Sequence, residues 1–444
     1  MTVIGLDDTD SRRAGMCTTY LATRLAEAIV EAGGEVDRRL LVRLNPAVEH
    51  KTRGNAALGL HTDLTVDRAF ALACDRLESL AISADSRTSP GVVVAPGSPE
   101  SVPETVVDHA RRAVRHHVSL EKTLTIVDGA GYRHRGWAGA GCDVEGRGRI
   151  GALAAVGAWA AFEEWTHERI AYREFDRCGT PRTVDTEAVF AAAEAGYPEV
   201  WDTVDREAAE AVCVPNAPGP ILYGIRGDEA AAVETVAADI AAAEGTERVD
   251  RWSTFLTNQG TDQHLADGSV GSLREGAGYR VDGRVDSAPE TRQGGHVFFK
   301  LAAVADREAG MTEEADDETV DCVAFEPTKR FRDRVRKLRV GDRLTVCGEH
   351  SEGTIKLEKF AVRERNRTEQ VTPTCPDCGR RMKSAGRNQG YRCRDCKTSE
   401  PRKVDRTVDR DLDIGWYEVP PVARRHIAKP LVRGGFDAPT HPER

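Results

Sequence analysis

Residues 3–34 have the sequence VIGLDDTDSRRAGMCTTYLATRLAEAIVEAGG, and this stretch decides the fold of the N-terminal part. A short apolar run ends in carboxylates, and a loop rich in Gly, Asp and Ser then leads into a helical pattern over residues 17–32. Further strands are predicted at 36–44, 59–66, 91–95 and 123–128, with helices near 67–82 and 104–117 between them. Because strands and helices alternate, an α/β domain is predicted over residues 1–145.

A second alternation of helices and strands begins near residue 146. The expected elements are helix 148–164, strand 169–174, helix 185–195, strand 221–225, helix 228–243 and strand 248–255. Two strand–helix–strand halves of this size are typical of a ferredoxin-like sandwich, which we predict over residues 146–268. The order of the strands in space stays open, because sequence does not reveal it.

The texture changes to short strands separated by turns from about Tyr279 onward. The five strand-like runs are YRVDGRVD (279–286), HVFFKLAAV (296–304), DCVAFEP (321–327), DRLTVCGEH (342–350) and TIKLEKFAV (354–362). With a helical link at 328–338, they predict an OB-fold β-barrel over residues 278–367. The tail, 404–444, is rich in Pro and Gly and is expected to be weakly structured in isolation. The chain as a whole is predicted to be a multidomain α+β protein.

Length and composition exclude several classes of protein. A chain of 444 residues is too long for one hydrophobic core, so several domains are expected. No run approaches the ~18 consecutive apolar residues of a membrane span, and the N-terminus carries acids where a signal peptide would be basic. We therefore predict a cytoplasmic protein with no membrane partner, and the sequence gives no sign of an obligate protein partner.

The charges are unevenly distributed along the chain. Residues 1–320 carry 33 basic and 53 acidic side chains, whereas residues 321–444 carry 29 basic and 19 acidic ones. A basic third on an otherwise acidic protein predicts a polyanionic partner. Only 11 of the 62 basic residues are Lys, and this acid-rich, Lys-poor composition suggests adaptation to a salty cytosol.

Three carboxylates, those of Asp7, Asp8 and Asp10, follow the first predicted strand. Hard oxygen ligands at a strand end suit Mg²⁺ that holds nucleotide phosphates, although a polar loop before a helix is the alternative. The loop continues through Gly15 to Thr18 and Thr19, where a helix N-terminus could bind an anion. The threonine hydroxyls could cap the helix, or could bind or accept a phosphate. Together these features favour a nucleotide site, with Asp7, Asp8, Asp10 and Thr18 as its candidate catalytic residues.

Three other polar segments are candidate binding sites. Lys51, Arg53 and Asn55 form either an exposed basic turn or a clamp on phosphate. The segment GRGRIG (146–151) resembles a phosphate loop, but we interpret it as tight helix packing. A dense polar run follows a predicted strand at 257–264; such runs are usually turns, but this one could contact a base or a polyamine through Asn258, Gln259, Asp262 and His264.

Four cysteines form the strongest local signal. Cys375 and Cys378 form one C-x₂-C pair, Cys393 and Cys396 form a second, and 14 residues separate the two pairs. This spacing predicts a zinc ribbon over residues 371–403 with one structural Zn²⁺, because four thiolates leave no open ligand position. Basic residues and Tyr391 around it favour contact with RNA or DNA over a merely solvated surface.

Several ordered motifs resemble the archaeal 2-agmatinylcytidine synthetase family, which modifies the AUA-decoding isoleucine tRNA. They are GLDDTDSRRAGMCTTY (5–20), NPAVEHKTRGNAA (45–57), GRGRIGALAAVGA (146–158), PILYGIRG (220–227), FLTNQGTDQHL (255–265) and EPTKRFR (326–332), followed by the ribbon. The resemblance implies a kinase-like domain peculiar to the family, a ferredoxin-like domain, an OB fold and a zinc ribbon. It adds Lys329, Arg330 and Arg332 as expected contacts of substrate or tRNA.

The resemblance also implies the reaction. The wobble cytidine of the tRNA is phosphorylated on its C2 oxygen, and the primary amine of agmatine then displaces the phosphate. ATP is converted to AMP with release of both terminal phosphates. Thr18 matches a threonine that the family phosphorylates on its own chain, and Asp7, Asp8 and Asp10 match ligands of Mg²⁺ and the ATP phosphates. Gly15, Thr19, Lys51, Arg53 and Asn55 are expected to bind ATP or phosphate.

Two other functions stay open at this point. A non-catalytic RNA-binding protein would explain the basic C-terminal third, but it leaves the N-terminal acids and hydroxyls unexplained. An ATP-dependent enzyme of the same fold could instead attach a different amine to tRNA, since no spacing identifies an agmatine-binding residue.

Overall fold

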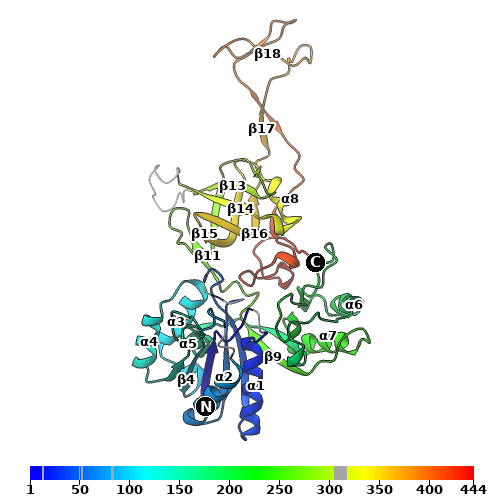
Figure 1. The fold of residues 1–444 in the computed structure, drawn as a ribbon. Helices are drawn as coiled ribbons and strands as arrows, with labels where there is room; N and C mark the ends of the chain where they lie inside the picture. The colour runs from blue at the N-terminus through cyan, green and yellow to red at the C-terminus, as the bar shows by residue number, and fades with distance from the viewer. Residues whose placement is uncertain (13–14, 50, 52–53, 82–84, 305–317) are drawn as a thin grey trace.

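The fold is described from a computed structural model of residues 1–444, and the structure describes all of them except 13–14, 50, 52–53, 82–84 and 305–317. A nine-stranded sheet with the order β5-β4-β1-β3-β2-β9-β6-β8-β7 forms the base of the molecule (Figure 1). Its first half contains β1 (Thr2–Asp7), β2 (Val36–Arg43), β3 (Ala56–Thr62), β4 (Gly91–Pro96) and β5 (Arg133–Gly136). Its second half contains β6 (Thr166–Tyr172), β7 (Val200–Trp201), β8 (Ile221–Gly227) and β9 (Arg251–Thr257).

The two halves join where β2 and β9 run in parallel. Leu40 lies opposite Leu256, and Leu41 lies opposite Thr257. The neighbouring residues Leu40 and Leu41 point to opposite faces of the sheet, as successive strand residues must, and both are fully buried. The two units predicted from the sequence therefore share one continuous sheet.

Helices cover both faces of the first half. α1 (Thr18–Glu31) and α2 (Val66–Leu80) pack on the face that carries Leu41, whereas α3 (Glu104–Arg115) and α5 (Arg149–Ala161) pack on the face that carries Leu40. α6 (Thr186–Gly196) and α7 (Ala230–Ala242) cover the second half. Helix α5 begins the second predicted unit in sequence, yet it buries its alanines against the strands of the first.

The strand predicted at 123–128 is wrong, because these residues lie in helix α4 (Leu120–Gly129). The run TLTIVD is β-branched and apolar, which favours a strand. Ser119, however, caps the helix by accepting a hydrogen bond from the Lys122 N–H, and Thr123 and Val127 are buried one helical turn apart. The other helices and strands predicted in residues 1–268 are present, with ends shifted by a few residues.

A β-barrel stands above the sheet (Figure 1). The five predicted strands are confirmed as β11 (Ala277–Val285), β13 (Val297–Ala302), β14 (Thr319–Ala324), β15 (Arg343–Ser351) and β16 (Thr354–Glu364), with α8 (Phe331–Arg336) as the helical link. β15 pairs with both β11 and β16, so the sheet curls into a barrel. β10 (Leu265–Gly268) and β12 (Glu290–Thr291) extend it.

The C-terminal tail packs against the barrel and returns to the sheet. β22 (Gly415–Glu418) pairs with β16, β23 (Thr440–His441) pairs with β22, and Trp416 and Leu431 are buried. The Arg433 guanidinium donates to the Asp228 carboxylate of the second half at 2.6 Å. In the full chain the tail is therefore well structured, because β16 supplies the hydrogen-bonding edge that an isolated tail lacks.

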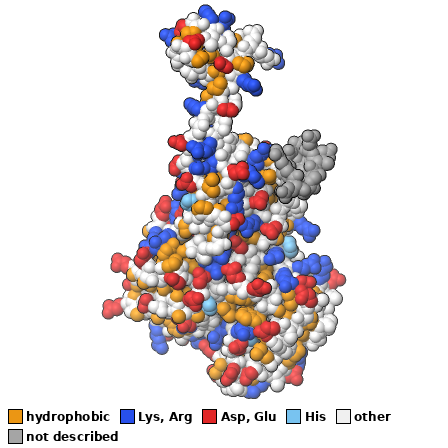
Figure 2. Space-filling model, turned by 180° about the vertical axis from the view of Figure 1, so that it is seen from behind, with side chains coloured by type: hydrophobic (Ala, Val, Ile, Leu, Met, Phe, Trp, Pro, Cys, Tyr) orange, Lys and Arg blue, Asp and Glu red, His pale blue; other side chains and the backbone are white. Residues whose placement is uncertain are grey.

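The cysteine cluster lies at the far end of a two-stranded stalk formed by β17 (Thr368–Val371) and β21 (Val404–Thr407) (Figure 1). Three short strands surround it, β18 (Lys383–Ser384), β19 (Tyr391–Arg392) and β20 (Ser399–Glu400). Figure 2 shows basic side chains on this cysteine-containing end of the molecule and on the stalk that carries it. Among the described residues, no helix is long and apolar enough to cross a membrane.

Candidate active site and metal centre

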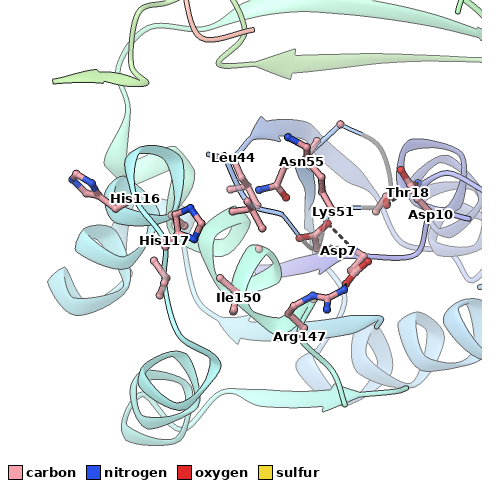
Figure 3. A pocket seen from close by; sticks show the side chains of 18 residues that line it. Asp7, Asp10, Thr18, Leu44, Lys51, Asn55, His116, His117, Arg147 and Ile150 are labelled. Atoms are coloured by element: carbon pink, nitrogen blue, oxygen red, sulfur yellow. Dashed lines mark hydrogen bonds and ion pairs between the residues drawn. The ribbon is translucent and has the colours of Figure 1, made fainter. Parts of the chain in front are cut away.

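A cavity opens at the carboxyl end of β1, where the three aspartates lie (Figure 3). It holds about 820 Å³, including its open mouth. One end is lined by Asp7, Asp8, Asp10, Thr18 and Arg147, and the other by Leu44, Val48, Ala113, His116, His117, Val118 and Ile150. The cavity therefore has an acidic end rich in hydroxyl and guanidinium groups, and an apolar end bounded by imidazoles.

Burial disfavours the charged forms of the carboxylates at this site. Burial raises the pKa of Asp7 well above its usual range, and the neighbouring Asp8 carboxylate raises it further. Burial also raises the pKa of Asp8 to about 6, although the Arg147 guanidinium opposes the shift. Because the ionised carboxylates repel one another in a dry site, a bound cation would favour their charged forms.

Two glycines let helix α5 approach the Asp7 carboxylate. A Cβ added to Gly151 would lie 2.0 Å from Asp7 Oδ2, and one added to Gly148 would lie 2.5 Å from the Asp7 carbonyl oxygen. The segment 146–151 is therefore tight helix packing, as interpreted from the sequence. It also forms part of the cavity wall, which the sequence did not reveal.

Asp10 and Thr18 are held together at the start of helix α1. The Thr18 N–H donates to Asp10 Oδ1 at 2.5 Å, and the Thr18 hydroxyl donates to the same oxygen at 2.9 Å. Cys17 is the N-cap residue and makes no side-chain capping bond. Of the roles left open for Thr18, capping is not what the structure shows, because its hydroxyl points to a carboxylate at the edge of the cavity.

Arg147 is a site residue that the sequence analysis did not single out. Its guanidinium donates to Asp8 Oδ2 at 2.8 Å and to the Arg87 carbonyl at 2.6 Å, and its backbone N–H donates to the Ser89 hydroxyl. A cation fixed in this way beside the carboxylates can neutralise phosphate charge. The only signal for it was the GRGRIG segment, whose glycines made packing the better interpretation.

The remaining residues expected to bind phosphate are spread over the site. Lys51 and Asn55 line the first cavity, where Lys51 Nζ donates to the Pro46 carbonyl. Arg53 lies outside the described residues. Thr19 faces a different cavity, and Gly15 takes a left-handed turn (φ 90°) that packs against the Cys178 side chain.

A second cavity shares Asp10, Thr18, Gly54 and Ala56 with the first and holds about 700 Å³, including its mouth. It lies between the two halves of the sheet and combines an apolar wall with the charged side chains of Asp10, Arg43, Glu168 and Arg182. Glu168 is 3% exposed, and its carboxylate forms ion pairs with the guanidinium groups of Arg43 at 3.0 Å and Arg226 at 3.3 Å. Cys17, Thr19, Leu58, Ile170, Pro215, Ala217, Gly219 and Ile221 complete the lining.

The polar run at 258–264 lies beside this cavity, but its side chains bind other parts of the protein. Asn258 is fully buried, where it accepts from the Arg43 N–H at 2.7 Å and donates to the Arg43 carbonyl at 3.0 Å. Gln259 accepts from Arg43 Nε at 3.0 Å, Asp262 pairs with Lys359, and a ring nitrogen of His264 bonds the Arg43 carbonyl at 3.0 Å. These bonds hold the end of β2.

The segment 329–332 is likewise mostly engaged within the protein. Arg330 pairs with Asp205 at 3.1 Å and so ties the barrel to the second half of the sheet. Arg332 donates to the Gly295 carbonyl at 2.7 Å. Lys329 alone of the three is exposed, in a left-handed turn (φ 47°).

The four cysteines form a centre that fits zinc. Their sulfur atoms lie within 4.8 Å of one another, and Cys378 Sγ and Cys393 Sγ are 3.6 Å apart. Tetrahedral Zn–S bonds of about 2.3 Å place sulfurs about 3.8 Å apart. Backbone N–H groups of Cys396 and Asp395 lower the pKa of Cys393 to about 7, whereas the neighbouring thiols raise the pKa of Cys396, so four thiolates together require the charge of a metal ion.

Within the part of the chain that the structure describes, these cysteines are the one group of three or more ligating side chains that converge on a point. Asp7, Asp8 and Asp10 do not converge in this way. Their chemistry still fits Mg²⁺, because this ion is usually held by one or two carboxylates while phosphate and water complete its shell.

The fold, the acidic cavity and the cysteine centre define a multidomain α+β protein. It combines a cavity whose residues suit a metal-bound phosphate with a β-barrel and a zinc ribbon. Three domain profiles of one family match it. The TiaS TCKD domain matches residues 3–66, the TiaS FLD domain matches 146–264, and the TiaS C-terminal zinc ribbon domain matches 372–412.

Similar proteins align over almost the whole chain. The isoleucine-tRNA 2-agmatinylcytidine synthetase TiaS of Haloquadratum walsbyi is 58% identical over 472 residues and covers 100% of both chains. The protein of the same name from Methanosarcina mazei is 43% identical over 438 residues and covers 97% of each chain.

Solved structures agree with this relationship. The structure of a complex of TiaS with its isoleucine tRNA and ATP has a TM-score of 0.84 at 38% identity and covers 100% of this chain and 99% of that one. The structure of a complex of TiaS with the same tRNA, AMPCPP and agmatine has a TM-score of 0.83 at 35% identity, with the same coverage. This chain therefore belongs to the TiaS family of isoleucine-tRNA 2-agmatinylcytidine synthetases.

We predict that Gly151→Ala abolishes nucleotide binding at the first cavity. The added Cβ would meet the Asp7 carboxylate at 2.0 Å, so either the carboxylate or helix α5 must move. Gly129→Ala, a helix glycine with no atom within 4 Å of the added Cβ, is the matched control and should be neutral. Calorimetric titration with ATP checks this, and wild-type affinity in the Gly151 variant would contradict the proposed role of the acids.

We also predict about one zinc per chain, as one closed four-thiolate site requires. Cys393→Ser should release this zinc and weaken tRNA binding, while ATP binding at the cavity some distance from the stalk stays unchanged. Metal analysis and a filter-binding titration of tRNA measure the two effects. The control is Cys142→Ser, a cysteine outside the cluster. A purified wild-type protein without zinc would refute the centre.

Proposed function

We propose that this protein ligates agmatine to C2 of the wobble cytidine of the AUA-decoding isoleucine tRNA, using ATP. One observation carries the proposal. The two cavities meet at the Asp10–Thr18 pair, so a phosphoryl group bound in one can reach an acceptor bound in the other. A ligation that first phosphorylates its acceptor needs this arrangement. The names of the relatives, and their complexes with isoleucine tRNA, ATP and agmatine, support the same activity.

ATP is assigned to the first cavity. Its phosphates would lie at the acidic end with Arg147 and Lys51, and its base at the apolar end near Leu44 and His117. Mg²⁺, held by Asp7 and Asp8, would neutralise the phosphates and orient them for transfer. The N-terminus of helix α1 adds a favourable dipole for an anion at Thr18.

The cytidine and agmatine are assigned to the second cavity. Its apolar wall, which includes Leu58, Ile170 and Ile221, suits an aromatic base or the alkyl chain of a diamine-like substrate. The Asp10 carboxylate at the junction can attract the cationic amine. The Glu168 carboxylate is already paired with two arginines, so its role is to fix the wall.

The reaction proceeds in two steps at the substrate base. The C2 oxygen of the cytidine takes a phosphoryl group, which turns that oxygen into part of a leaving group. The primary amine of agmatine attacks C2, the C2–oxygen bond breaks, and phosphate leaves with the former base oxygen. The amine loses its protons to nearby acceptors, for which the Asp10 carboxylate at the junction of the two cavities is suitably placed. Thr18 is proposed to accept or bind phosphate during the cycle.

The domain roles follow from this assignment. We assign residues 1–145 to a kinase-like domain, 146–268 to a ferredoxin-like domain, 278–367 to an OB fold and 371–403 to the zinc ribbon, with 404–444 as the tail. The barrel and the basic ribbon would bind the tRNA. A tRNA substrate supports the proposal that the protein acts in the cytoplasm.

The function is tested by mass spectrometry of the AUA-decoding isoleucine tRNA after incubation with protein, ATP and one amine. With agmatine, the anticodon fragment should gain the mass of agmatine less one water. Omission of ATP and an Asp8→Asn variant are the controls, and neither should show the gain. A gain with lysine or putrescine but not with agmatine would show another tRNA-modifying amine ligase. No gain with any amine, despite tRNA binding, would show a non-catalytic RNA-binding protein.

We predict that Thr18→Ala lowers ligation by orders of magnitude while the melting temperature changes little, because the hydroxyl serves chemistry and caps no helix. Thr18→Ser keeps the hydroxyl and should retain much of the activity. With ATP labelled at the γ position, the wild-type chain should become labelled and the Ala variant should not. An Ala variant that modifies tRNA at the wild-type rate would overturn this role.

A further inference from the structure

The loop at residues 258–264 follows β9 in the second half of the sheet and leads to β10 of the barrel. At its start, the Asn258 amide makes two hydrogen bonds with the backbone of Arg43, at 2.7 and 3.0 Å. The Gln259 side-chain oxygen accepts a hydrogen bond from Arg43 Nε at 3.0 Å, and the same guanidinium donates to the Glu168 carboxylate. Arg43 and Glu168 are walls of the second cavity, so the loop determines the shape of that cavity.

The same loop is anchored at Asp262 by the barrel and the tail. Lys359 of strand β16 is 1% exposed, and its ammonium donates to Asp262 Oδ2 at 2.5 Å and to the Lys429 carbonyl at 3.2 Å. The backbone N–H of Lys429 donates to the other carboxylate oxygen of Asp262 at 2.5 Å. Asp262 has a left-handed backbone (φ 62°), which these bonds stabilise.

The tail adds a second contact on the end of β2. The rings of His264 and His426 lie edge to face with centroids 5.1 Å apart. A ring nitrogen of His264 bonds the Arg43 carbonyl at 3.0 Å, and one of His426 bonds the Leu44 carbonyl at 3.2 Å. Leu44 lines the first cavity. The loop and the tail therefore hold the strand end from which both cavities are built.

We infer that Lys359 is a positioning residue for ligation, acting through Asp262 on the Arg43–Glu168 wall of the substrate cavity. This inference rests on the proposed function. It means that the barrel completes the catalytic centre and does not serve only to grip tRNA. Lys359 is too buried to contact RNA, and the aromatic rings of Phe436 and Trp416, whose centroids lie 4.8 and 5.7 Å from the ammonium, shield that ammonium from water. The Lys359 side chain is 1% exposed and that of Asp262 is 29% exposed, so the buried ammonium depends on Asp262 and the Lys429 carbonyl for its solvation, which fixes the geometry of the pair.

The test compares two RNA substrates in the full-length protein. A complete tRNA is large enough to reach the barrel and the ribbon, whereas a short anticodon stem-loop offers far less RNA to them. Lys359→Met should lower kcat about 10- to 100-fold on both RNAs alike, because the displaced wall misaligns the reacting groups whichever RNA is bound. ATP affinity and zinc content should stay unchanged. Lys300→Met, an exposed lysine of the barrel, is the control and should leave the stem-loop reaction unchanged.

A double-mutant cycle separates a coupled pair from two independent effects. If Lys359 acts through Asp262, the Asp262→Asn/Lys359→Met double variant should be no less active than the Lys359→Met single variant. Rates are measured well below the melting temperature of each variant, so that loss of folded protein does not contribute.

A Lys359→Met variant that loses activity on complete tRNA but keeps it on the stem-loop would overturn the inference and make this region a tRNA-binding surface. Losses that multiply in the double variant would also overturn it. Failure of the wild-type protein to ligate agmatine would instead overturn the proposed function.

Discussion

The parallel pairing of β2 with β9 is the constraint on which the rest of the structure depends. It turns two units into one sheet and brings the carboxyl ends of both strands to the same place, where Asn258 clasps the backbone of Arg43. One cavity opens on the side of β1 and α5, and the other opens between the two halves. A site shared between two units needs a fixed register, and buried hydrogen bonds of the backbone provide one.

Electrostatics explains why this site is built from both acids and arginines. The acids alone would be unstable as buried anions, and the raised pKa values of Asp7 and Asp8 express that cost. The Arg147 guanidinium offsets part of this cost, and a metal ion bound with a nucleotide would balance the remaining negative charge. Burial acts to raise the pKa of Glu168 as well, but the charges of Arg226 and Arg43 outweigh it, so that this pKa is lowered. The first cavity therefore holds carboxylates with raised pKa values, whereas the second holds Glu168, whose pKa is lowered.

Local sequence patterns predicted much of this architecture. The helix after the acids, the five barrel strands and the four-cysteine ribbon each have a signal within a few tens of residues, and all are present. The shared sheet and the fold of the tail were not predictable, since both depend on pairing partners far away in the chain. Helix α4 was mistaken for a strand because its β-branched run is locally ambiguous.

The candidate site was predictable where its residues are contiguous. Asp7, Asp8, Asp10 and Thr18 follow one strand and do line one cavity. Arg147 and Glu168 gave no usable signal, because their partners lie 139 and 125 residues away. The polar run at 258–264 gave a clear signal whose meaning was open, and the structure shows internal hydrogen bonds for it.

The central claim is that the base oxygen of the cytidine is activated by phosphate at the junction of the two cavities. The most direct test uses an RNA whose wobble cytidine carries ¹⁸O at its C2 oxygen, followed by mass analysis of the phosphate released during ligation. If the phosphorylated oxygen is the one displaced, one ¹⁸O atom leaves in inorganic phosphate for each agmatine attached. Ligation that leaves the phosphate unlabelled would contradict it.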